Sequence, residues 1–167
     1  MVSKQLYRDG MSRLAAAVHI VTTDGPAGAT GFTASACCSV TDDPPTLLVC
    51  LNRFTQLHSI FQQNGVFCVN TLAGEQQELS ELFAHRAGTP MPERFAQPGW
   101  EKAVSGSLRL RDALASFDCR ISEVREVGTH FVIFGEVQDM RISHGDSALL
   151  YVNRAYVQLP VQRPKNE

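Results

Sequence analysis

The chain has 167 residues, of which 44% are hydrophobic and 19% charged, and its formal net charge is −2. That length is typical of one domain and buries enough surface to need no disulfide or metal, so we expect a single domain over residues 1–167. The balanced charge lacks the clustered basic excess of nucleic-acid-binding proteins. No apolar run approaches the ~20 residues that span a bilayer, and the N-terminus has no signal-peptide core. These features predict a soluble, cytoplasmic protein that binds neither nucleic acid nor membrane.

The cysteine pattern indicates reduced thiols rather than disulfides or a metal site. There are five cysteines, with no C-x-x-C pair and no histidine at zinc-ligand spacing. Cys50, Cys68 and Cys119 have apolar neighbours, which favours buried thiols in a reducing compartment. The side chains of Cys37 and Cys38 would point to opposite sides of an extended segment.

Local patterns predict short strands with a few peripheral helices. Apolar spacing predicts helices over residues 5–17, 56–63 and 75–86, the second with Thr55 as its N-cap. Extended segments are expected at residues 18–23, 31–36, 46–52, 66–70, 117–122, 130–137 and 148–159. The segment 46–52 is continuously apolar, which predicts burial on both faces. Because helices do not alternate regularly with strands, the pattern favours a small β-barrel or sandwich with helices outside.

Small and hydroxylated residues are concentrated between Thr33 and Thr41. In one continuous strand, Thr33, Ser35, Cys37 and Ser39 would share a face. Such a face lets a flat ligand lie against the backbone, and the Ser39 and Thr41 hydroxyls could bind a phosphate. The alternative is a plain strand beneath a helix, and periodicity alone favours it because no Walker or Rossmann loop is present.

Two other places carry candidate functional side chains. Arg53 lies between a buried strand and an expected helix, where helix N–H groups and a guanidinium bind anions, although a solvated surface charge is the commoner explanation. Gly128 permits a tight turn that would present His130 at the start of a strand. Residues 144–146 are interpreted as a turn.

The other histidines are not candidates for chemistry. His19 is expected within the core, and we expect His58, His85 and His144 in solvent. There is no G-x-S-x-G or H-E-x-x-H motif, so hydrolase and metalloprotease functions have no support.

The segments taken together resemble a known family over nearly the whole chain. The matching stretches, in chain order, are 21–28, 31–53, 67–72, Pro92-Glu-Arg-Phe95, 116–121, Val127-Gly-Thr-His130 and 150–156. This series resembles the short-chain flavin reductases, which supply reduced flavin to two-component monooxygenases. The most similar branches serve pyrimidine utilisation and 4-hydroxyphenylacetate 3-monooxygenase.

The resemblance implies a fold, a reaction and partners. The fold would be mainly β with peripheral helices, a split β-barrel of the flavin reductase type, forming a homodimer with the flavin near the subunit interface. The reaction would be hydride transfer from NADH, or less often NADPH, to FMN or FAD. The reduced flavin would then pass to a separate monooxygenase component.

The resemblance also assigns residues by position. Four small residues would line the isoalloxazine ring: Thr33, Ala34, Ser35 and Ala36. Five would hold the ribityl phosphate side: Ser39, Val40, Asn52, Arg53 and Thr55. Four more would lie near the cofactor: Phe83, Ala84, Arg154 and Tyr156. His130 is the candidate catalytic residue on the nicotinamide side, but the family's usual Gly-Asp-His is here Gly128-Thr129-His130, without the acid.

The residues themselves fit such a reaction. Direct hydride transfer requires two stacked rings and exclusion of water rather than a strong base, in keeping with the lack of a recognisable catalytic dyad. Two alternatives stay open: a non-catalytic flavin-binding module, and a reductase that passes electrons to a ferric chelate.

Overall fold

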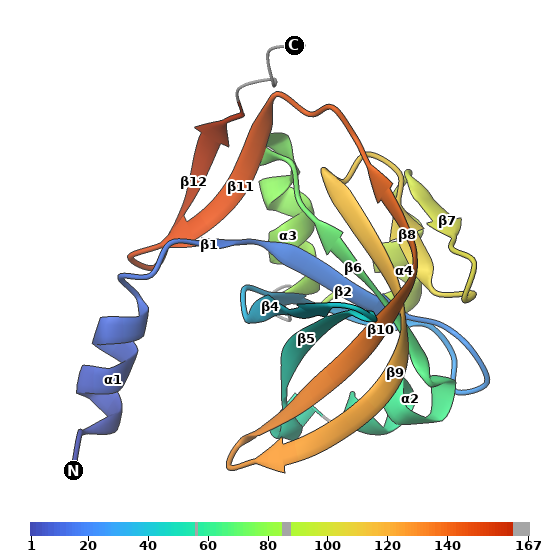
Figure 1. Ribbon diagram of the computed structural model, residues 1–167. Helices are drawn as coiled ribbons and strands as arrows, with labels where there is room; N and C mark the ends of the chain where they lie inside the picture. The colour runs from blue at the N-terminus through green and yellow to red at the C-terminus, as the bar shows by residue number, and fades with distance from the viewer. Residues whose placement is uncertain (56, 85–87, 162–167) are drawn as a thin grey trace.

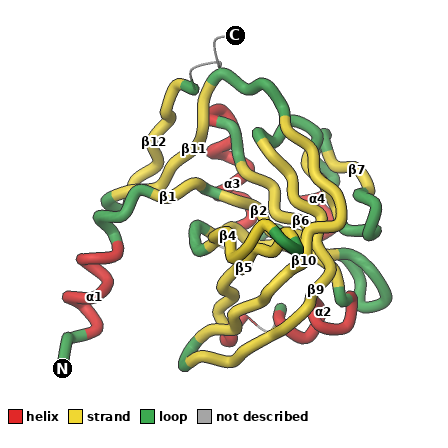
Figure 2. The backbone as a smooth tube through the Cα atoms, in the orientation of Figure 1, coloured by secondary structure: helices red, strands yellow, loops and turns green. Residues whose placement is uncertain are grey.

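The computed structural model describes residues 1–55, 57–84 and 88–161. The chain is mainly β, with short helices at the periphery (Figures 1 and 2). The helices are α1 (Lys4–Met11), α2 (His58–Asn64), α3 (Gln77–Phe83) and α4 (Met91–Phe95), with 3-10 turns η1 (Arg53–Thr55) and η2 (Gly74–Gln76). The first six strands are β1 (Ala16–Ala17), β2 (His19–Thr23), β3 (Thr30–Ala34), β4 (Cys37–Asp42), β5 (Pro45–Asn52) and β6 (Val66–Thr71). The others are β7 (Trp100–Lys102), β8 (Leu108–Leu110), β9 (Ala115–Val127), β10 (His130–Ile142), β11 (Ser147–Val152) and β12 (Ala155–Pro160).

Seven strands form one antiparallel sheet in the order β3-β2-β6-β9-β10-β5-β4. Its outer strands, β3 and β4, are not hydrogen-bonded to each other, so the described strands form an open, curled sheet rather than a closed ring. The β9–β10 register shifts between Phe134 and Gly135. A Cβ on Gly135 would lie 2.3 Å from Cζ of Phe67, so only glycine lets β10 approach the core this closely.

A smaller sheet, β1-β11-β12, stands beside the main one (Figure 1). Strands β11 and β12 form a hairpin whose turn residues, Asn153 and Arg154, have φ of 51° and 62°, as two-residue turns of the I′ type require. The single extended segment expected over 148–159 is therefore two strands joined by a turn.

Two hydrophobic clusters make up the core. The first fills the curled sheet and includes Phe32, Phe61 and Phe67. The second lies between α3, β8 and β11 and includes Phe83 and Leu149. Phe32 and Phe83 both reach the same cavity, so the site described below lies where the two clusters meet.

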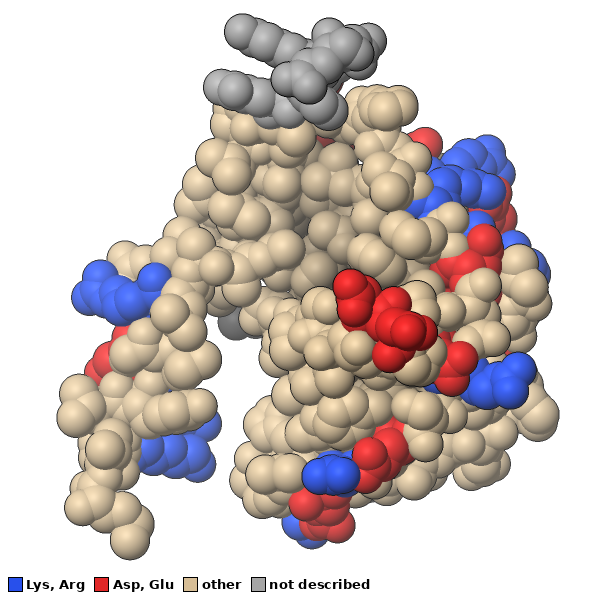
Figure 3. All heavy atoms as spheres, in the orientation of Figure 1, with Lys and Arg blue, Asp and Glu red and all other residues tan. Residues whose placement is uncertain are grey.

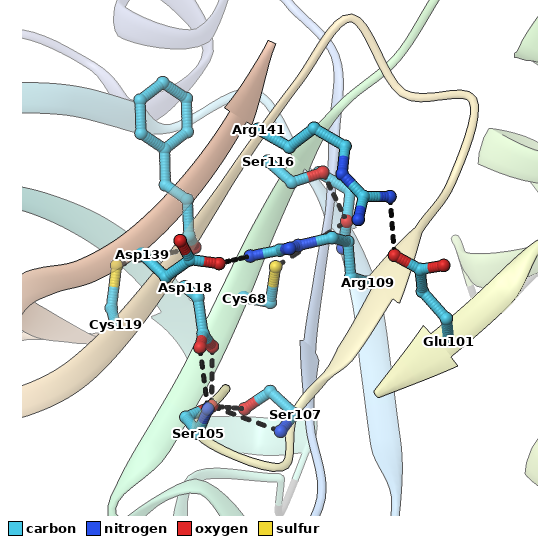
Figure 4. Close-up of polar contacts among 12 residues, drawn as sticks. Cys68, Glu101, Ser105, Ser107, Arg109, Ser116, Asp118, Cys119, Asp139 and Arg141 are labelled. Carbon is cyan, nitrogen blue, oxygen red and sulfur yellow. Dashed lines mark hydrogen bonds and ion pairs between the residues drawn. The ribbon is translucent and has the colours of Figure 1, made fainter. Parts of the chain in front are cut away.

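A buried polar network fixes the β8 side of the molecule (Figure 4). Arg109 is ion-paired with Asp139. Asp118, fully buried, accepts hydrogen bonds from the backbone N–H of Ser105 at 2.8 Å and from its hydroxyl at 2.5 Å. Cys68 lies within this network, and burial raises the pKa of its thiol to about 12. Such a thiol stays protonated and unreactive.

The expected burial of Cys68 and Cys119 is confirmed, whereas Cys50 is only partly buried. The opposite orientation of Cys37 and Cys38 is confirmed too. Cys37 packs against the first core cluster, and Cys38 is exposed.

Two helix predictions were wrong at their ends. The helix expected over 5–17 ends at Met11, and Ala16 and Ala17 instead pair with β11. The sheet edge therefore takes the alanine run, because backbone pairing overrides alanine's helix propensity. The second helix begins at His58, with Leu57 at its N-cap. Thr55 belongs to η1, and its hydroxyl donates to the Asn52 carbonyl at 2.7 Å. Residue 56 lies outside the described residues.

The helix expected over 75–86 is η2 followed by α3, and positions 85 and 86 lie outside the described residues. In β5 the burial alternates: Leu47, Val49 and Leu51 are buried, and their neighbours are not. The prediction of burial on both faces was therefore wrong: at the end of β5 the less buried side chains, Cys50 and Asn52, line the cavity described below.

Candidate functional site

A cavity of about 940 Å³ opens beside α3. Its walls come from four parts of the chain that are distant in sequence. They are β3 with the two residues after it, the end of β5 with η1, helix α3, and the β11–β12 hairpin, joined by Val18 and by His130 at the start of β10.

The first wall is made of small residues. Thr33 and Ala34 end β3, and Ser35 and Ala36 lead away from it. The Ala36 carbonyl accepts a hydrogen bond from the Cys50 N–H at 3.0 Å, which joins this wall to β5. No side chain in this run is larger than threonine, so a flat molecule can lie close to the backbone here.

The prediction that alternate residues from Thr33 to Ser39 share one face was wrong beyond Ser35. The chain passes from β3 to β4, the two outer strands of the main sheet, and the step at residues 35–36 interrupts the alternation of side chains. As a result Cys37 packs against the core. Ser39 and Val40 are exposed on β4 and do not line the cavity.

Ser80 joins three of the walls. Its carbonyl accepts a hydrogen bond from the Thr33 hydroxyl at 2.6 Å, and its own hydroxyl lies 2.9 Å from the Tyr156 hydroxyl. Tyr156 in turn packs edge-on against Tyr151, with ring centroids 5.2 Å apart. The small-residue wall, α3 and the hairpin are therefore held in one arrangement.

His130 stands on the β5–β10 wall. The turn before it includes Gly128, with φ of 57°, so its predicted position at a strand start is confirmed. In the sheet register His130 pairs with Asn52, and both side chains reach the cavity. Nδ1 of His130 lies 2.9 Å from the Thr129 hydroxyl, a contact that orients the imidazole.

The two predicted arginines lie differently. Arg154 lines the cavity and is ion-paired with Asp9 of α1. Arg53 turns away from the cavity: its Nη1 lies 2.5 Å from Glu126 Oε1 and 3.2 Å from the Gly128 carbonyl oxygen. The Arg53 side chain lines a separate, smaller hollow.

Eleven of the fourteen predicted site residues therefore line one cavity, and Ser39, Val40 and Arg53 do not. The cavity also contains residues that sequence reasoning missed. Cys50 lies two positions before Asn52 in β5, so the period of a strand could have indicated it. Glu78 and Glu81 belong to the helix predicted over residues 75–86, where apolar spacing indicated only the apolar face. Tyr151 is brought in by the hairpin, and no local pattern signalled it.

The histidine predictions had mixed outcomes. His19 is in the core: its Nδ1 lies 3.1 Å from the Thr71 hydroxyl, and burial lowers its pKa to about 4. His144 is exposed, as predicted. His58 is only partly exposed rather than free in solvent, because its ring stacks on Phe131 with centroids 4.4 Å apart. His85 lies outside the described residues.

Within the part of the chain that the structure describes, no three His, Cys, Asp or Glu side chains are grouped to bind a metal. None of the helices in that part is long and apolar enough to cross a membrane.

Known proteins resemble this chain in sequence and in fold. The model of the flavin reductase-like domain matches residues 11–160. The FMN reductase (NADH) RutF of Stutzerimonas stutzeri is 55% identical over 155 residues, 93% of this chain and 88% of that protein.

Solved structures agree. A candidate flavin reductase from Haemophilus somnus 129pt is 46% identical with a TM-score of 0.89, covering 95% of this chain and all of that one. BorF, the flavin reductase component of a bacterial two-component tryptophan halogenase, is 30% identical with a TM-score of 0.89, covering 96% and 100%. Because the family model matches residues 11–160, which is most of this chain, the chain belongs to the flavin reductase-like domain family.

Proposed function

We propose that the protein is an NADH-dependent FMN reductase that releases reduced flavin to a separate monooxygenase component. The observation that carries the proposal is the single cavity in which residues 33–36 and His130 come together. The relatives named FMN reductase (NADH) support the choice of NADH and FMN. BorF, the reductase component of a two-component halogenase, supports a separate partner protein that uses the reduced flavin.

The cavity fits a flavin. Its small-residue wall can take the flat isoalloxazine ring, with Phe83 at the base and backbone groups at Ser35 and Ala36 near the ring's polar edge. Asn52 and Thr55 would lie along the ribityl phosphate side. Arg53 would reach a phosphate only after leaving Glu126 and Gly128, and Ser39 and Val40 stand outside the cavity, so we assign the phosphate side to Asn52 and Thr55.

The protein's role is positioning. Flavin and nicotinamide supply the hydride chemistry themselves when bound together. His130, oriented by Thr129, faces the cavity from the β5–β10 wall and would contact the nicotinamide. The Ser80 hydrogen bonds hold α3 and Phe83 in place, which keeps the ring site narrow and limits water. Precise stacking of this kind is the main source of rate in a direct transfer.

We further propose that the curled sheet is a split β-barrel and that two copies associate. Helix α1 has no buried residue and stands away from the body (Figure 1). Its side chains Leu6, Tyr7 and Met11 are exposed, Leu6 by 63%. Exposed apolar surface on this scale favours association. Figure 3 shows that the face over β1 and β11 beside α1 is almost uncharged, and Asp9 links α1 to Arg154 of the cavity.

The dimer has a direct test. Leu6→Glu together with Met11→Glu should shift the mass measured by light scattering from two copies towards one. Lys4→Glu, on the same helix without loss of an apolar side chain, should not. A wild-type protein of single-copy mass would contradict the association.

The reaction is tested by mixing purified protein with NADH and FMN and following loss of the nicotinamide absorbance band. Replacing NADH by NADPH and FMN by FAD ranks the four pairs, with NADH and FMN expected to be fastest. No oxidation with either flavin would contradict the proposal. Retention of flavin through gel filtration without NADH turnover would instead indicate a binding module, and faster turnover with a ferric chelate would indicate a ferric reductase.

A further inference from the structure

A second hollow, of about 430 Å³, adjoins the proposed flavin cavity. It is lined by Arg53, Phe54, His58, Glu126 and Phe131. Two short segments, residues 52–55 and 130–131, lie between the cavity and the hollow and contribute lining residues to both. In the first, Asn52 and Thr55 reach the cavity while the two residues between them reach the second hollow. In the other segment, at the start of β10, His130 lines the cavity and Phe131 lines the second hollow. The hollows therefore lie back to back across one turn of chain.

The lining of the second hollow suits a flat aromatic ring. Phe54 is 73% exposed, which costs hydrophobic free energy unless a ligand or partner covers it. His58 stacks on Phe131 at 4.4 Å with an interplanar angle of 22°. Nδ1 of His58 is buried without a hydrogen-bond partner in the described part of the chain, and an orphaned buried polar atom of this kind calls for a partner.

The charge at this hollow suits a phosphate. The Arg53 guanidinium lies 5.7 Å from the Phe54 ring centroid, beside the aromatic surface. It is paired with Glu126 at 2.5 Å, but the two side chains are 44% and 53% exposed. Exposed ion pairs are weak, whereas the pyrophosphate of a dinucleotide gives Arg a bidentate partner that carries two negative charges in all. Glu126 therefore holds Arg53 in position, and a phosphate can replace Glu126 as the partner of Arg53.

We propose that this hollow binds the adenosine phosphate portion of a dinucleotide whose ring portion lies in the main cavity. Adenine would stack on Phe54 with a ring nitrogen or amino group near His58, and a phosphate would meet Arg53. The inference rests on the proposed function, because that function brings a dinucleotide to the cavity. NADH and FAD carry the same adenosine portion, so either is a candidate source.

The experiment compares each dinucleotide with its mononucleotide in Phe54→Ala. One arm measures kcat/KM with NADH and with reduced nicotinamide mononucleotide, at saturating FMN. The other measures the Kd of FAD and of FMN by quenching of flavin fluorescence. Val127→Ala is the matched control, because Val127 is also exposed at the end of the β9–β10 hairpin but does not line the hollow.

In Phe54→Ala we expect the preference for one dinucleotide over its mononucleotide to fall about tenfold, the typical loss of one base stacked on an aromatic side chain. A fall confined to the NADH arm identifies the donor's adenosine, and a fall confined to the FAD arm identifies the flavin's. Glu126→Gln should move the same ratio in the opposite direction, because Arg53 is released.

Unchanged ratios in both arms, or equal falls in Phe54→Ala and Val127→Ala, would overturn the inference. A wild-type protein that oxidises no NADH would contradict the proposed function instead. The equilibrium comparison of FAD with FMN needs no turnover, so it still decides whether the hollow binds adenosine.

Discussion

The hydroxyl groups of Ser80 and Tyr156 lie 2.9 Å apart, across the junction of α3 and β12. Ser80 is fully buried, and its carbonyl also accepts the Thr33 hydroxyl. A single helix residue thus connects the small-residue wall to the C-terminal hairpin. The contact therefore helps to set the shape of the cavity that Thr33 and Tyr156 line.

Tyr156→Phe should lower the free energy of unfolding by about 1–2 kcal/mol, since the buried Ser80 hydroxyl loses its partner. In a chain of this size that corresponds to a fall in Tm of about 2–4 °C per kcal/mol. Thermal unfolding followed by circular dichroism measures it. Tyr7→Phe is the control, because Tyr7 is exposed on α1. Equal Tm values for Tyr156→Phe and wild type would show that the hydroxyl contact contributes nothing.

His130→Ala should slow hydride transfer by about tenfold or more, because loss of one positioning contact misaligns the stacked rings, and it should change the Kd of FMN much less. Stopped-flow reduction under anaerobic conditions gives the rate, and flavin fluorescence gives the Kd. Thr129→Val removes only the contact that orients the imidazole and should give a smaller loss. Equal losses of rate and flavin affinity in His130→Ala would place His130 on the flavin side.

The place where the small-residue run leaves the cavity can be tested with two matched substitutions. Ser35→Leu puts a branched side chain on the cavity wall and should weaken FMN binding strongly. Ser39→Leu makes the same change on the exposed face of β4, outside the cavity, and should leave the Kd nearly unaltered. Fluorescence titration of both variants decides the matter. A stronger effect at Ser39 would return that residue to the phosphate side.

The cavity residues show which features of the site could be predicted from the sequence and which could not. The motifs in chain order identified the family and eleven of the cavity residues. This was possible because the residues of each short motif line one wall of the cavity together. Strict alternation failed between Ser35 and Ser39 because the chain there crosses from one outer strand to the other, a tertiary event that no local period records. His58 was misplaced for a similar reason. Its stacking partner, Phe131, comes from a strand more than seventy positions away.

The end of α1 and the role of Tyr151 were also beyond local reasoning. Ala16 and Ala17 favour a helix, but β11 offers them backbone partners, and such pairing is decided by the whole sheet. Tyr151 reaches the cavity only because the hairpin folds back onto α3. The turn at Gly128, the presence of the helices and the half-buried strands were predictable, since glycine conformation and apolar period are local properties. Residues 144–146, interpreted as a turn, are irregular with a bend at Asp146.

Stability should depend on pH through His19. Burial lowers its pKa from the ordinary 6.5 to about 4 in the folded chain, so between these values the unfolded chain binds the extra proton. The free energy of unfolding should therefore fall as the pH falls from about 6.5 to about 4, by about 3 kcal/mol in total. Urea unfolding at a series of pH values measures the slope. His19→Gln should flatten it, and His144→Gln, an exposed control, should not. A wild-type curve that rises towards acid would contradict the assignment.

Cysteine alkylation offers a test of the flavin site that does not depend on turnover. Cys38 is exposed and Cys50 partly so, whereas burial raises the pKa of Cys37 to about 11 and keeps that thiol protonated. Because the thiolate is the reactive form, iodoacetamide should label Cys38 first and Cys50 more slowly, with the buried thiols labelled only after unfolding. Cys50 lines the cavity and Cys38 does not, so saturating FMN should slow the labelling of Cys50 alone, as read by mass spectrometry of peptides. Undiminished labelling of Cys50 in the presence of bound FMN would place the flavin elsewhere, since a ring lying along residues 33–36 must cover the neighbouring face of β5.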